Sequence, residues 1–273
     1  MKIEICDEIK SLVKRFSLLP QVDAVALAGS LATSSSDLLS DYDLYVYLNA
    51  PIDIDKRKEI TCDLFRYIEI NNCFWEMEDD GILLKEDVPV DIVYREISWL
   101  QDNLTNRVEK FLADVGYTTC FWANLMSSKV LFERDNCLSN LQKRFDVPYP
   151  QQLRENIIKK NYPLLKLQLP AYYFQIEKAI KRKDFISINH RIAALLASYF
   201  DIVFAINCVK HVGEKKIMDT IKNVCKKVPQ NCEKDVNAIL SSAYSIDTLL
   251  FSINSLVQNL DDLLKKENFN MLQ

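Results

Sequence analysis

Every segment with the pattern of a β-strand lies before Pro150, and this asymmetry limits the folds that the chain can adopt. In the first half, short runs of apolar and β-branched residues alternate with helical patterns. After the "VPYP" stretch at 147–150, only helical spacing of apolar residues remains. The pattern predicts an α+β domain over residues 1–148, with a small mixed sheet and flanking helices, and an all-α helical bundle over residues 149–273.

The expected elements follow from the period of the apolar residues. In the first half we expect helices over 3–18, 53–68 and 97–112, and strands over 22–28, 44–48, 73–77, 82–84 and 88–94. The short strands in the middle are expected to turn near "EDDG" at 78–81. In the second half we expect helical structure over 151–183, interrupted at Pro163 and Pro170, and helices over 186–208 and 215–227. Apolar residues then recur every three to four positions from Val236 to Leu264, which predicts one long helix packed in a bundle.

Composition and charge exclude several classes of protein. The 273 residues are 49% hydrophobic and 26% charged, and a chain of this length buries a core without disulfide bonds. Its eight cysteines form no C-x-x-C pair, and with only two histidines a zinc site is not expected. The start of the chain lacks a signal-peptide core, and the longest apolar run, 192–206, is too short for a membrane span. We therefore expect a cytoplasmic protein without a membrane partner. The net charge of −4 argues against a nucleic-acid partner.

The chain contains only four glycines, so neither a G-x-G-x-x-G dinucleotide loop nor a phosphate-binding P-loop is present. One glycine, Gly29, directly follows the expected strand over 22–28 and precedes Ser30. A glycine at this place lets backbone amides approach a ligand closely, and the serine adds a hydroxyl. The small residues at 32–36 then leave room for a triphosphate. The segment is typical of a phosphate-binding turn.

Two acids, Asp41 and Asp43, stand where the next strand begins. Residues two apart on a strand point to the same face, so the two carboxylates are expected to lie together. Like charges at short range repel, and a cation between them removes the repulsion. A short pair of oxygen ligands suits Mg²⁺, which accepts phosphate oxygens as further ligands. The same spacing in Asp53-Ile54-Asp55 opens a helix, where capping of free amides explains it.

Asp91 interrupts an otherwise apolar strand over 88–94. A lone carboxylate in such a strand is costly unless it binds a metal or accepts hydrogen bonds. It could complete a two-metal site, in which two ions activate the attacking oxygen and stabilise the leaving one. The alternative is a structural ion pair with Arg95. The acids upstream favour the metal site.

These motifs resemble the nucleotidyltransferase superfamily of polymerase-β type. "LAGS" at 27–30 is followed, after a gap of ten residues, by "DYDLYVYL" at 41–48 and later by "VDIVY" at 90–94. Family members have a strand, Gly-Ser, a similar gap, Asp-x-Asp opening a second strand, and a third acid on a later strand. The length and the helical second half are similar to the kanamycin, streptomycin and lincosamide nucleotidyltransferases and their uncharacterised bacterial relatives.

The resemblance implies a role for each motif residue. Gly29 and Ser30 would contact the β- and γ-phosphates of ATP, Asp41 and Asp43 would hold Mg²⁺, and Asp91 would complete the metal site or act as the base. Many small members carry an arginine shortly after Gly-Ser, where this chain has Thr33. "HVGEKK" at 211–216 resembles a segment whose lysine meets nucleotide phosphates, which implies Lys215 or Lys216 as a substitute.

Further ionisable residues have no settled role. Glu76 and Glu78 in "WEMEDD" at 75–80 point to one face of an expected strand, where they would attract a cationic acceptor or supply the general base. The alternative interpretation, a solvated hairpin end, is slightly favoured. His190 and His211 lack a partner pattern and are expected to be hydrogen-bonded structural residues.

The combined prediction is a Mg²⁺-dependent nucleotidyltransferase that moves AMP from ATP to a hydroxyl of a small-molecule acceptor, possible acceptors including aminoglycoside-like antibiotics. Its expected catalytic and metal-binding residues are Asp41, Asp43 and Asp91, and its expected nucleotide-binding residues are Gly29, Ser30 and Lys215. Two alternatives stay open: adenylylation of a protein partner, and a nucleotide-binding relative that has lost catalysis. A third, RNA end addition, is disfavoured by the acidic balance.

Overall fold

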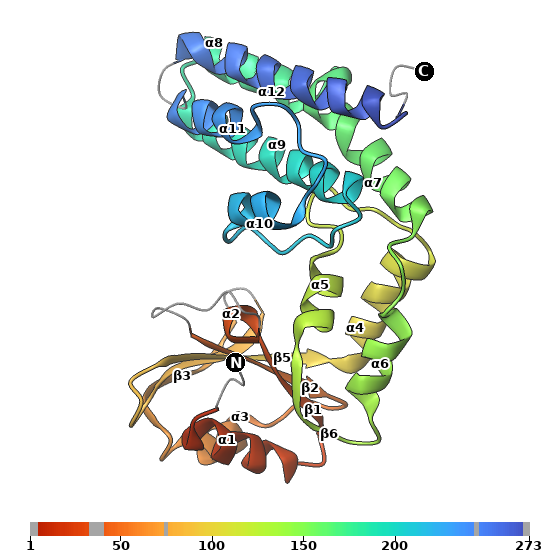
Figure 1. The fold of residues 1–273 in the computed structure, drawn as a ribbon. Coiled ribbons are helices and arrows are strands. Elements are labelled where there is room, and N and C mark those ends of the chain that lie inside the picture. The colour runs from red at the N-terminus through yellow and green to blue at the C-terminus, as the bar shows by residue number, and fades with distance from the viewer. Residues whose placement is uncertain (1–4, 33–40, 74–75, 243–245, 270–273) are drawn as a thin grey trace. The chain divides into compact units, whose positions relative to one another are not determined.

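The computed structural model describes residues 5–32, 41–73, 76–242 and 246–269 (Figure 1). The chain divides into two compact units. Unit 1 comprises Met1–Thr105 and Phe121–Val147, and unit 2 comprises Asn106–Cys120 and Pro148–Gln273. The segment Asn106–Cys120 therefore packs with the helical unit, although the expected domain bounds of 1–148 and 149–273 assign it to the first half.

Unit 1 is built on a six-stranded mixed sheet in the order β3-β4-β5-β2-β1-β6. The strands are β1 (Val22–Ala28), β2 (Tyr42–Leu48), β3 (Phe65–Asn72), β4 (Met77–Leu83), β5 (Pro89–Glu96) and β6 (Lys129–Glu133). β2 and β5 run parallel, and every other neighbouring pair is antiparallel. The expected fold class, a mixed sheet with helices followed by a largely helical region, is confirmed.

Helices cover the sheet and connect its strands. They are α1 (Asp7–Ser17), α2 (Gly29–Ala32), α3 (Ile54–Thr61), α4 (Ile97–Leu104), α5 (Cys120–Ser127) and α6 (Cys137–Phe145). The π-helix η1 (Thr105–Glu109) directly follows α4, and all but its first residue belong to unit 2. Figure 1 shows α1 and α3 on the same face of the sheet. On that face Ile9, Leu12 and Phe16 of α1 are buried in one apolar core with Leu44 and Val46 of β2. Alternation along β2 therefore sends Asp43 and Tyr45 to the opposite face.

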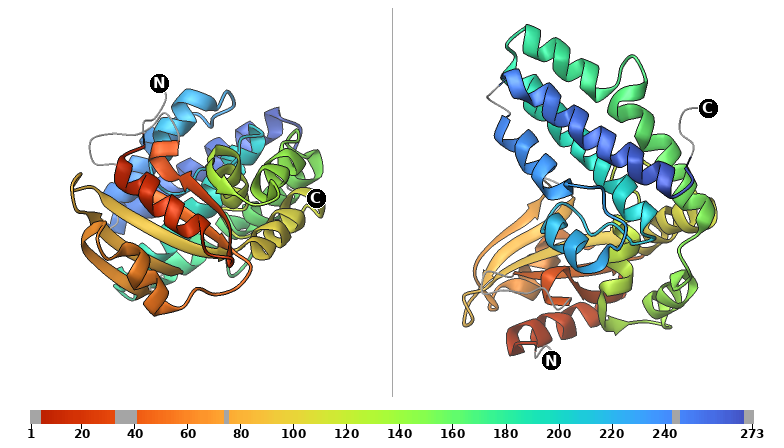
Figure 2. Two further views of the ribbon diagram at one scale, coloured as in Figure 1. Left: turned by 90° about the horizontal axis from the view of Figure 1, so that it is seen from below. Right: turned by 45° about the horizontal axis from the view of Figure 1, so that its top comes forward.

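Unit 2 is a helical bundle. Its helices are α7 (Gln151–Tyr162), η2 (Pro163–Leu167), α8 (Tyr172–Lys181), α9 (Phe185–Ile206), α10 (Ile217–Val224), α11 (Cys232–Ser241) and α12 (Ile246–Lys266). α9 packs against α7 and α8, and α12 packs against α8 and α11. Figures 1 and 2 show α8, α9 and α12 side by side. Within the described part of the chain, no helix is both long and apolar enough to cross a membrane.

The strand β3 corrects the expected helix over 53–68. Only Ile54–Thr61 is helical, and the chain continues as β3 from Phe65. The apolar residues Ile60, Leu64 and Ile68 fit a helical period locally, but residues 65–72 instead pair with β4 along the edge of the sheet. Asp53 is the N-cap residue of this helix, as expected, but its side chain makes no capping hydrogen bond, so that part of the prediction is wrong. Asp55 lies in the first turn, where its charge complements the helix dipole.

The "EDDG" stretch lies inside β4, where a turn was expected. Asp79 is fully buried on the α3 side, and Glu78 and Asp80 alternate to the other face. Gly81 is required by a cross-strand contact, since a Cβ there would lie 2.6 Å from Cδ1 of Phe65 on β3. The acidic residues and the glycine of "EDDG" are typical of a turn. The pairing of β4 with both of its neighbouring strands overrides that local preference.

Two further expectations are also corrected. The single helix expected over 236–264 is two helices: α11 ends at Ser241 and α12 begins at Ile246, with residues 243–245 outside the described part. The expected helix over 97–112 ends as α4 and η1 at Glu109. The strand β6 and the helices α5 and α6, which lie between 112 and 148, had no counterpart among the expected elements.

A buried carboxylate holds the segment Asn106–Cys120 to the rest of unit 2. Asp201 of α9 is 1% exposed, and its carboxylate accepts hydrogen bonds from the backbone N (3.1 Å) and Oγ1 (2.7 Å) of Thr118. Asn161 adds a 3.3 Å bond to the same carboxylate and accepts the backbone N of Gly116 at 2.9 Å. Burial raises the pKa of Asp201 to about 7, against the hydrogen bonds from Thr118, which lower it.

The raised pKa of Asp201 predicts a pH-dependent stability of unit 2. Between about pH 4 and pH 7 the folded state holds this proton and the unfolded state does not, so the free energy of unfolding falls as pH rises. Asp201→Asn removes this dependence. From pH 5 to pH 7, the unfolding free energy of the wild type should fall by about 2 kcal/mol relative to that of the variant. Urea titrations at each pH measure it.

The exposed acid Asp219 of α10 provides the control, because Asp219→Asn should leave the pH dependence as in the wild type. Parallel stability curves for the wild type and Asp201→Asn would contradict the assignment of the raised pKa to Asp201.

Candidate functional site

Four carboxylates lie in a row across the face of the sheet opposite α1 and α3. Asp43 of β2 is the register partner of Asp91 on the parallel strand β5, and Asp91 is the partner of Asp80 on β4. Asp80 in turn is opposite Glu69 on β3. Directly opposed residues point to the same face, and adjacent strands are about 4.8 Å apart. The sheet therefore brings Asp43 and Asp91 together.

Asp41 lies immediately before β2 and is half-buried, as are Asp43 and Asp91. Its place two residues before Asp43 keeps it at the same end of β2. The backbone thus brings together the three acids that the sequence singled out, Asp43 and Asp91 as direct neighbours and Asp41 at the entry to the strand.

Gly29 packs directly against the carboxylate of Asp43. Its φ is +64°, and a Cβ built on it would lie 1.6 Å from Oδ2 of Asp43. The pairing of Ala28 with Asp43 in the β1–β2 register brings the two residues together. Only glycine meets both requirements, the left-handed backbone and the close approach of a carboxylate. The side chain of Ser30 and residues 33–40, with Thr33, lie outside the described residues.

The donor set fits a magnesium ion that also carries substrate phosphates. Across the described residues, no group of three or more His, Cys, Asp and Glu side chains is arranged to hold a metal ion by itself. Mg²⁺ is commonly bound by one or two carboxylates and completes its octahedron with water and phosphate oxygens. Asp43 and Asp91 supply such a pair, and Gly29 lies directly against the first of the two carboxylates.

Asp80 is a member of the row that sequence reasoning missed, since "EDDG" was expected to form a turn. It is half-buried, and Nδ2 of Asn72 donates a 2.7 Å hydrogen bond to its Oδ2. Burial raises the pKa of Asp80 above its usual value, the bond from Asn72 lowers it, and the charges of Asp79 and Glu69 raise it further. Strict alternation through β4, with Asp79 facing inward, was the signal that could have identified it.

Glu76 pairs with Arg95, which answers one question left open by the sequence. The guanidinium donates two hydrogen bonds to Glu76, of 2.6 and 2.7 Å. It also stacks on the Tyr45 ring, with 4.3 Å to the centroid, and lies 5.3 Å from the ring centroid of Phe121. Glu76 is thus held in a structural pair beyond the carboxylate row. Trp75 lies outside the described residues, and Glu78 is half-buried opposite Val93.

A buried ion pair fixes the strands beneath the row. Asp79, fully buried, lies 3.2 Å from Nη1 of Arg57 and accepts 2.7 Å hydrogen bonds from the Tyr94 hydroxyl and the backbone N of Asn71. Burial raises the pKa of Asp79, whereas the hydrogen bonds from Asn71 and Tyr94 and the charge of Arg57 lower it. These contacts join α3, β3, β4 and β5 on the side away from the row.

The residues expected from the second half belong to unit 2. Lys215 and Lys216 are exposed just before α10, and the role of Lys215 at a phosphate stays a prediction. His190 is exposed on α9. His211 is fully buried: its backbone N donates to Oγ1 of Thr119 (2.8 Å), and its Nδ1 accepts the backbone N of Gly213 (3.1 Å). Burial lowers the pKa of His211 to about 4, so the ring is neutral at pH 7.

The contact between Gly29 and Asp43 predicts what an added methyl group would do. Gly29→Ala should displace the Asp43 carboxylate and shift its ¹³C resonance, assigned by its loss in Asp43→Asn. Gly213→Ala is the matched control, because Gly213 also has a positive φ (+96°) but no atom within 4 Å of the added Cβ. Both variants should lose roughly 1–3 kcal/mol of stability through backbone strain. An unmoved Asp43 resonance in Gly29→Ala would disprove the contact.

Comparison of the chain with models of protein families gives no match, and comparison with curated proteins gives none either. Among solved structures, the chain is similar to the crystal structure of a nucleotidyltransferase-like protein from Exiguobacterium sibiricum 255-15. The two are 11% identical in sequence, with a TM-score of 0.44. The match covers 96% of this chain and 77% of that chain.

Proposed function

We propose that the protein transfers a nucleoside monophosphate, AMP from ATP, to a hydroxyl group of an acceptor. The proposal rests on one observation. The carboxylates of Asp43 and Asp91 lie side by side on neighbouring parallel strands, and Gly29 packs against that of Asp43. The order of Gly-Ser, Asp-x-Asp and a third acid, which resembles the polymerase-β type of nucleotidyltransferase, supports the same reaction.

Each residue of the site has its own role in an in-line displacement at the α-phosphorus. Asp41 and Asp43 hold Mg²⁺, which when bound neutralises the triphosphate and orients it for attack. The backbone at Gly29 and Ser30 binds the β- and γ-phosphates, which leave together as pyrophosphate. The acceptor oxygen forms a bond to the α-phosphorus as the bond to the β-phosphate oxygen breaks. Asp91 takes the proton of the acceptor hydroxyl or completes the ligand set of the metal. Positioning and charge neutralisation provide most of the acceleration.

The charge of the same face favours a cationic acceptor. Beyond the pair at Asp43 and Asp91, the face continues with Asp80 and Glu69, and Arg95 is already engaged with Glu76. Excess negative charge beside a reaction centre attracts cations and raises their local concentration. A small aminosugar-like molecule fits this chemistry, and a hydroxyl of a protein partner is the alternative. A relative without catalysis would have no reason to keep the repelling acids together.

Metal-dependent nucleotide binding is the first test. Calorimetric titration with ATP, and separately with GTP, should give binding in the presence of Mg²⁺ and little without it. Asp43→Asn should weaken the Mg²⁺-dependent binding at least about tenfold, since it removes one charged ligand. Asp55→Asn is the matched control, because Asp55 is the second acid of the other D-x-D motif and pairs with Lys58 on the exposed surface of α3. Equal binding by both variants would refute the site.

Transfer itself is tested with ATP labelled on the α-phosphate and a panel of aminoglycosides and lincosamides. Asp91→Asn should lower the rate of label transfer about 100-fold or more, because general base and metal-ligand roles both demand the carboxylate. Glu76→Gln should have a smaller effect, because Glu76 pairs with Arg95 outside the row. Label found on protein, and on no small molecule, would select the alternative acceptor. Transfer by Asp91→Asn at the wild-type rate would refute the role of Asp91.

A further inference from the structure

A cluster of aromatic rings around one arginine lies on the same face of the sheet as the carboxylates. Tyr45 follows Asp43 by two residues on β2, so the two side chains share a face about 6.6 Å apart along the strand. The guanidinium of Arg95 stacks on the Tyr45 ring, with 4.3 Å to the centroid. It also lies 5.9 Å from the ring centroid of Trp99 on α4 and 5.3 Å from that of Phe121 on α5. We call Tyr45, Arg95, Trp99 and Phe121 the stacking shelf.

Polar contacts hold the inner part of the shelf in place. Glu76 accepts two hydrogen bonds from the Arg95 guanidinium, of 2.6 and 2.7 Å, and balances its charge. The side chain of Arg95 is only 9% exposed. Nδ2 of Asn124 donates a 3.1 Å hydrogen bond to the Tyr45 hydroxyl. A ligand that stacks on a surface fixed in this way has little of the protein to immobilise, which favours binding.

Trp99 is the exposed member of the shelf. Its side chain packs edge-on against Phe121, with 4.9 Å between the ring centroids and 90° between the ring planes. This contact orients the indole but does not cover it, because Trp99 stays 42% exposed, whereas Trp122 is fully buried. An oriented and exposed indole is a large flat surface on which another aromatic ring can stack.

We propose that the stacking shelf binds the purine base of the nucleotide, with the base stacked on the indole of Trp99. The inference rests on the proposed function, because it places the nucleoside of the same triphosphate that Gly29 and Asp43 would hold. The step from Asp43 to Tyr45 along β2 is one that a ribose can bridge. Nucleobases stack on aromatic side chains and on guanidinium planes, and a two-ring purine covers more of such a surface than a pyrimidine.

The charges of the face separate the place of the base from the place of the acceptor. Arg95 already occupies the Tyr45 ring as its cation–π partner, so a second cation gains little there. The carboxylates of Asp80 and Glu69 continue the row from Asp91 in the other direction, onto β4 and β3. That end of the row is left for a cationic acceptor, and the shelf at β2 and β5 is left for an uncharged base.

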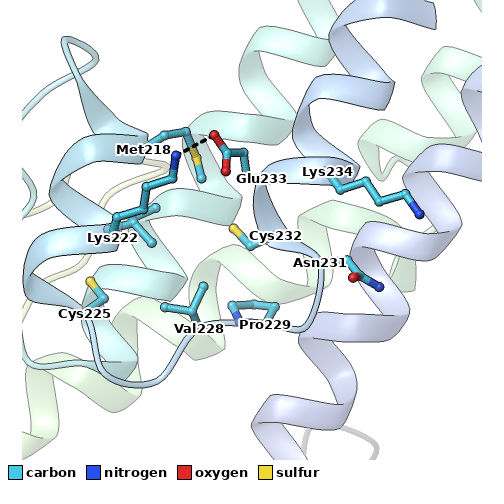
Figure 3. Close-up of a pocket in the computed structure, with 10 residues that line it drawn as sticks. Met218, Lys222, Cys225, Val228, Pro229, Asn231, Cys232, Glu233 and Lys234 are labelled. Atoms are coloured by element: carbon cyan, nitrogen blue, oxygen red, sulfur yellow. Dashed lines mark hydrogen bonds and ion pairs between the residues drawn. The ribbon is translucent and has the colours of Figure 1, made fainter.

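A cavity in unit 2 does not offer a base the same contacts. It has a volume of about 400 Å³ and lies where α10 and α11 meet (Figure 3). None of the ten described residues that line it is aromatic. Lys222 and Glu233 on its wall form an ion pair of 2.6 Å with each other. Of these two places, the shelf in unit 1 is the one with rings on which a base can stack.

The test separates the base from the phosphates. The full chain is titrated calorimetrically with ATP and with inorganic tripolyphosphate, each in the presence of Mg²⁺. Trp99→Leu should weaken ATP binding about tenfold and leave tripolyphosphate binding at the wild-type level, since only ATP carries a base. Trp99→Phe should keep most of the ATP affinity, because a flat ring remains. The same Trp99→Leu change should weaken CTP binding less than ATP binding, because the smaller base has less stacking to lose.

Phe185→Leu is the matched control for the loss of an exposed ring. Phe185 is 40% exposed on α9 of unit 2, and the variant should bind both ligands as the wild type does. Tryptophan fluorescence gives a second readout. ATP should quench the emission of the wild type, and this quenching should be lost in Trp99→Leu.

Two results would overturn the inference and leave the proposed function standing. One is wild-type ATP affinity in Trp99→Leu. The other is an equal fall in the affinities for ATP and tripolyphosphate in that variant, which would make Trp99 a structural residue. If the wild-type protein binds neither ligand in the presence of Mg²⁺, the proposed function fails, and the inference fails with it.

Discussion

The buried ion pair between Arg57 and Asp79 is the constraint on which the acidic face of the sheet depends. Two charges taken out of water are costly unless each is compensated, and here the Tyr94 hydroxyl and the Asn71 amide complete the contacts of the carboxylate. Asp79 can satisfy these partners only if it faces inward. A shift of β4 by one residue would bury Glu78 or Asp80 without a partner, which makes the register of the strand strongly specified.

Once β4 is fixed in this register, the positions of the acids on the opposite face of the sheet are fixed as well. Asp80 is set against Asp91, and the parallel pairing of β5 with β2 sets Asp91 against Asp43. The repulsion among these acids is tolerated because the apolar core on the other face, with Leu44 and Ile92, holds the strands together. A sheet of this kind separates two tasks: one face provides stability, and the other presents a row of carboxylates.

Unit 2 uses buried polar groups in a different way. The carboxylate of Asp201 is held by neutral donors from Thr118 and Asn161, and burial raises its pKa although the hydrogen bonds from Thr118 lower it. Buried His211 stays neutral for the same reason, since burial penalises the charged form. Both residues hold the segment Asn106–Cys120 and the loop before α10 within the helical unit.

The sequence by itself determined the strands around Gly29 and the helical second half, and it singled out the acids at 41, 43 and 91. Each of these follows from the local period of the apolar residues or from the spacing of a short motif. Only the tertiary structure decided that 65–72 is a strand, that "EDDG" lies inside β4, and that Asp80 joins the row while Glu76 pairs with Arg95. These facts depend on which strand pairs with which, and in what register. Local patterns cannot fix such pairing, because hydrogen bonds and burial between distant segments override local preference.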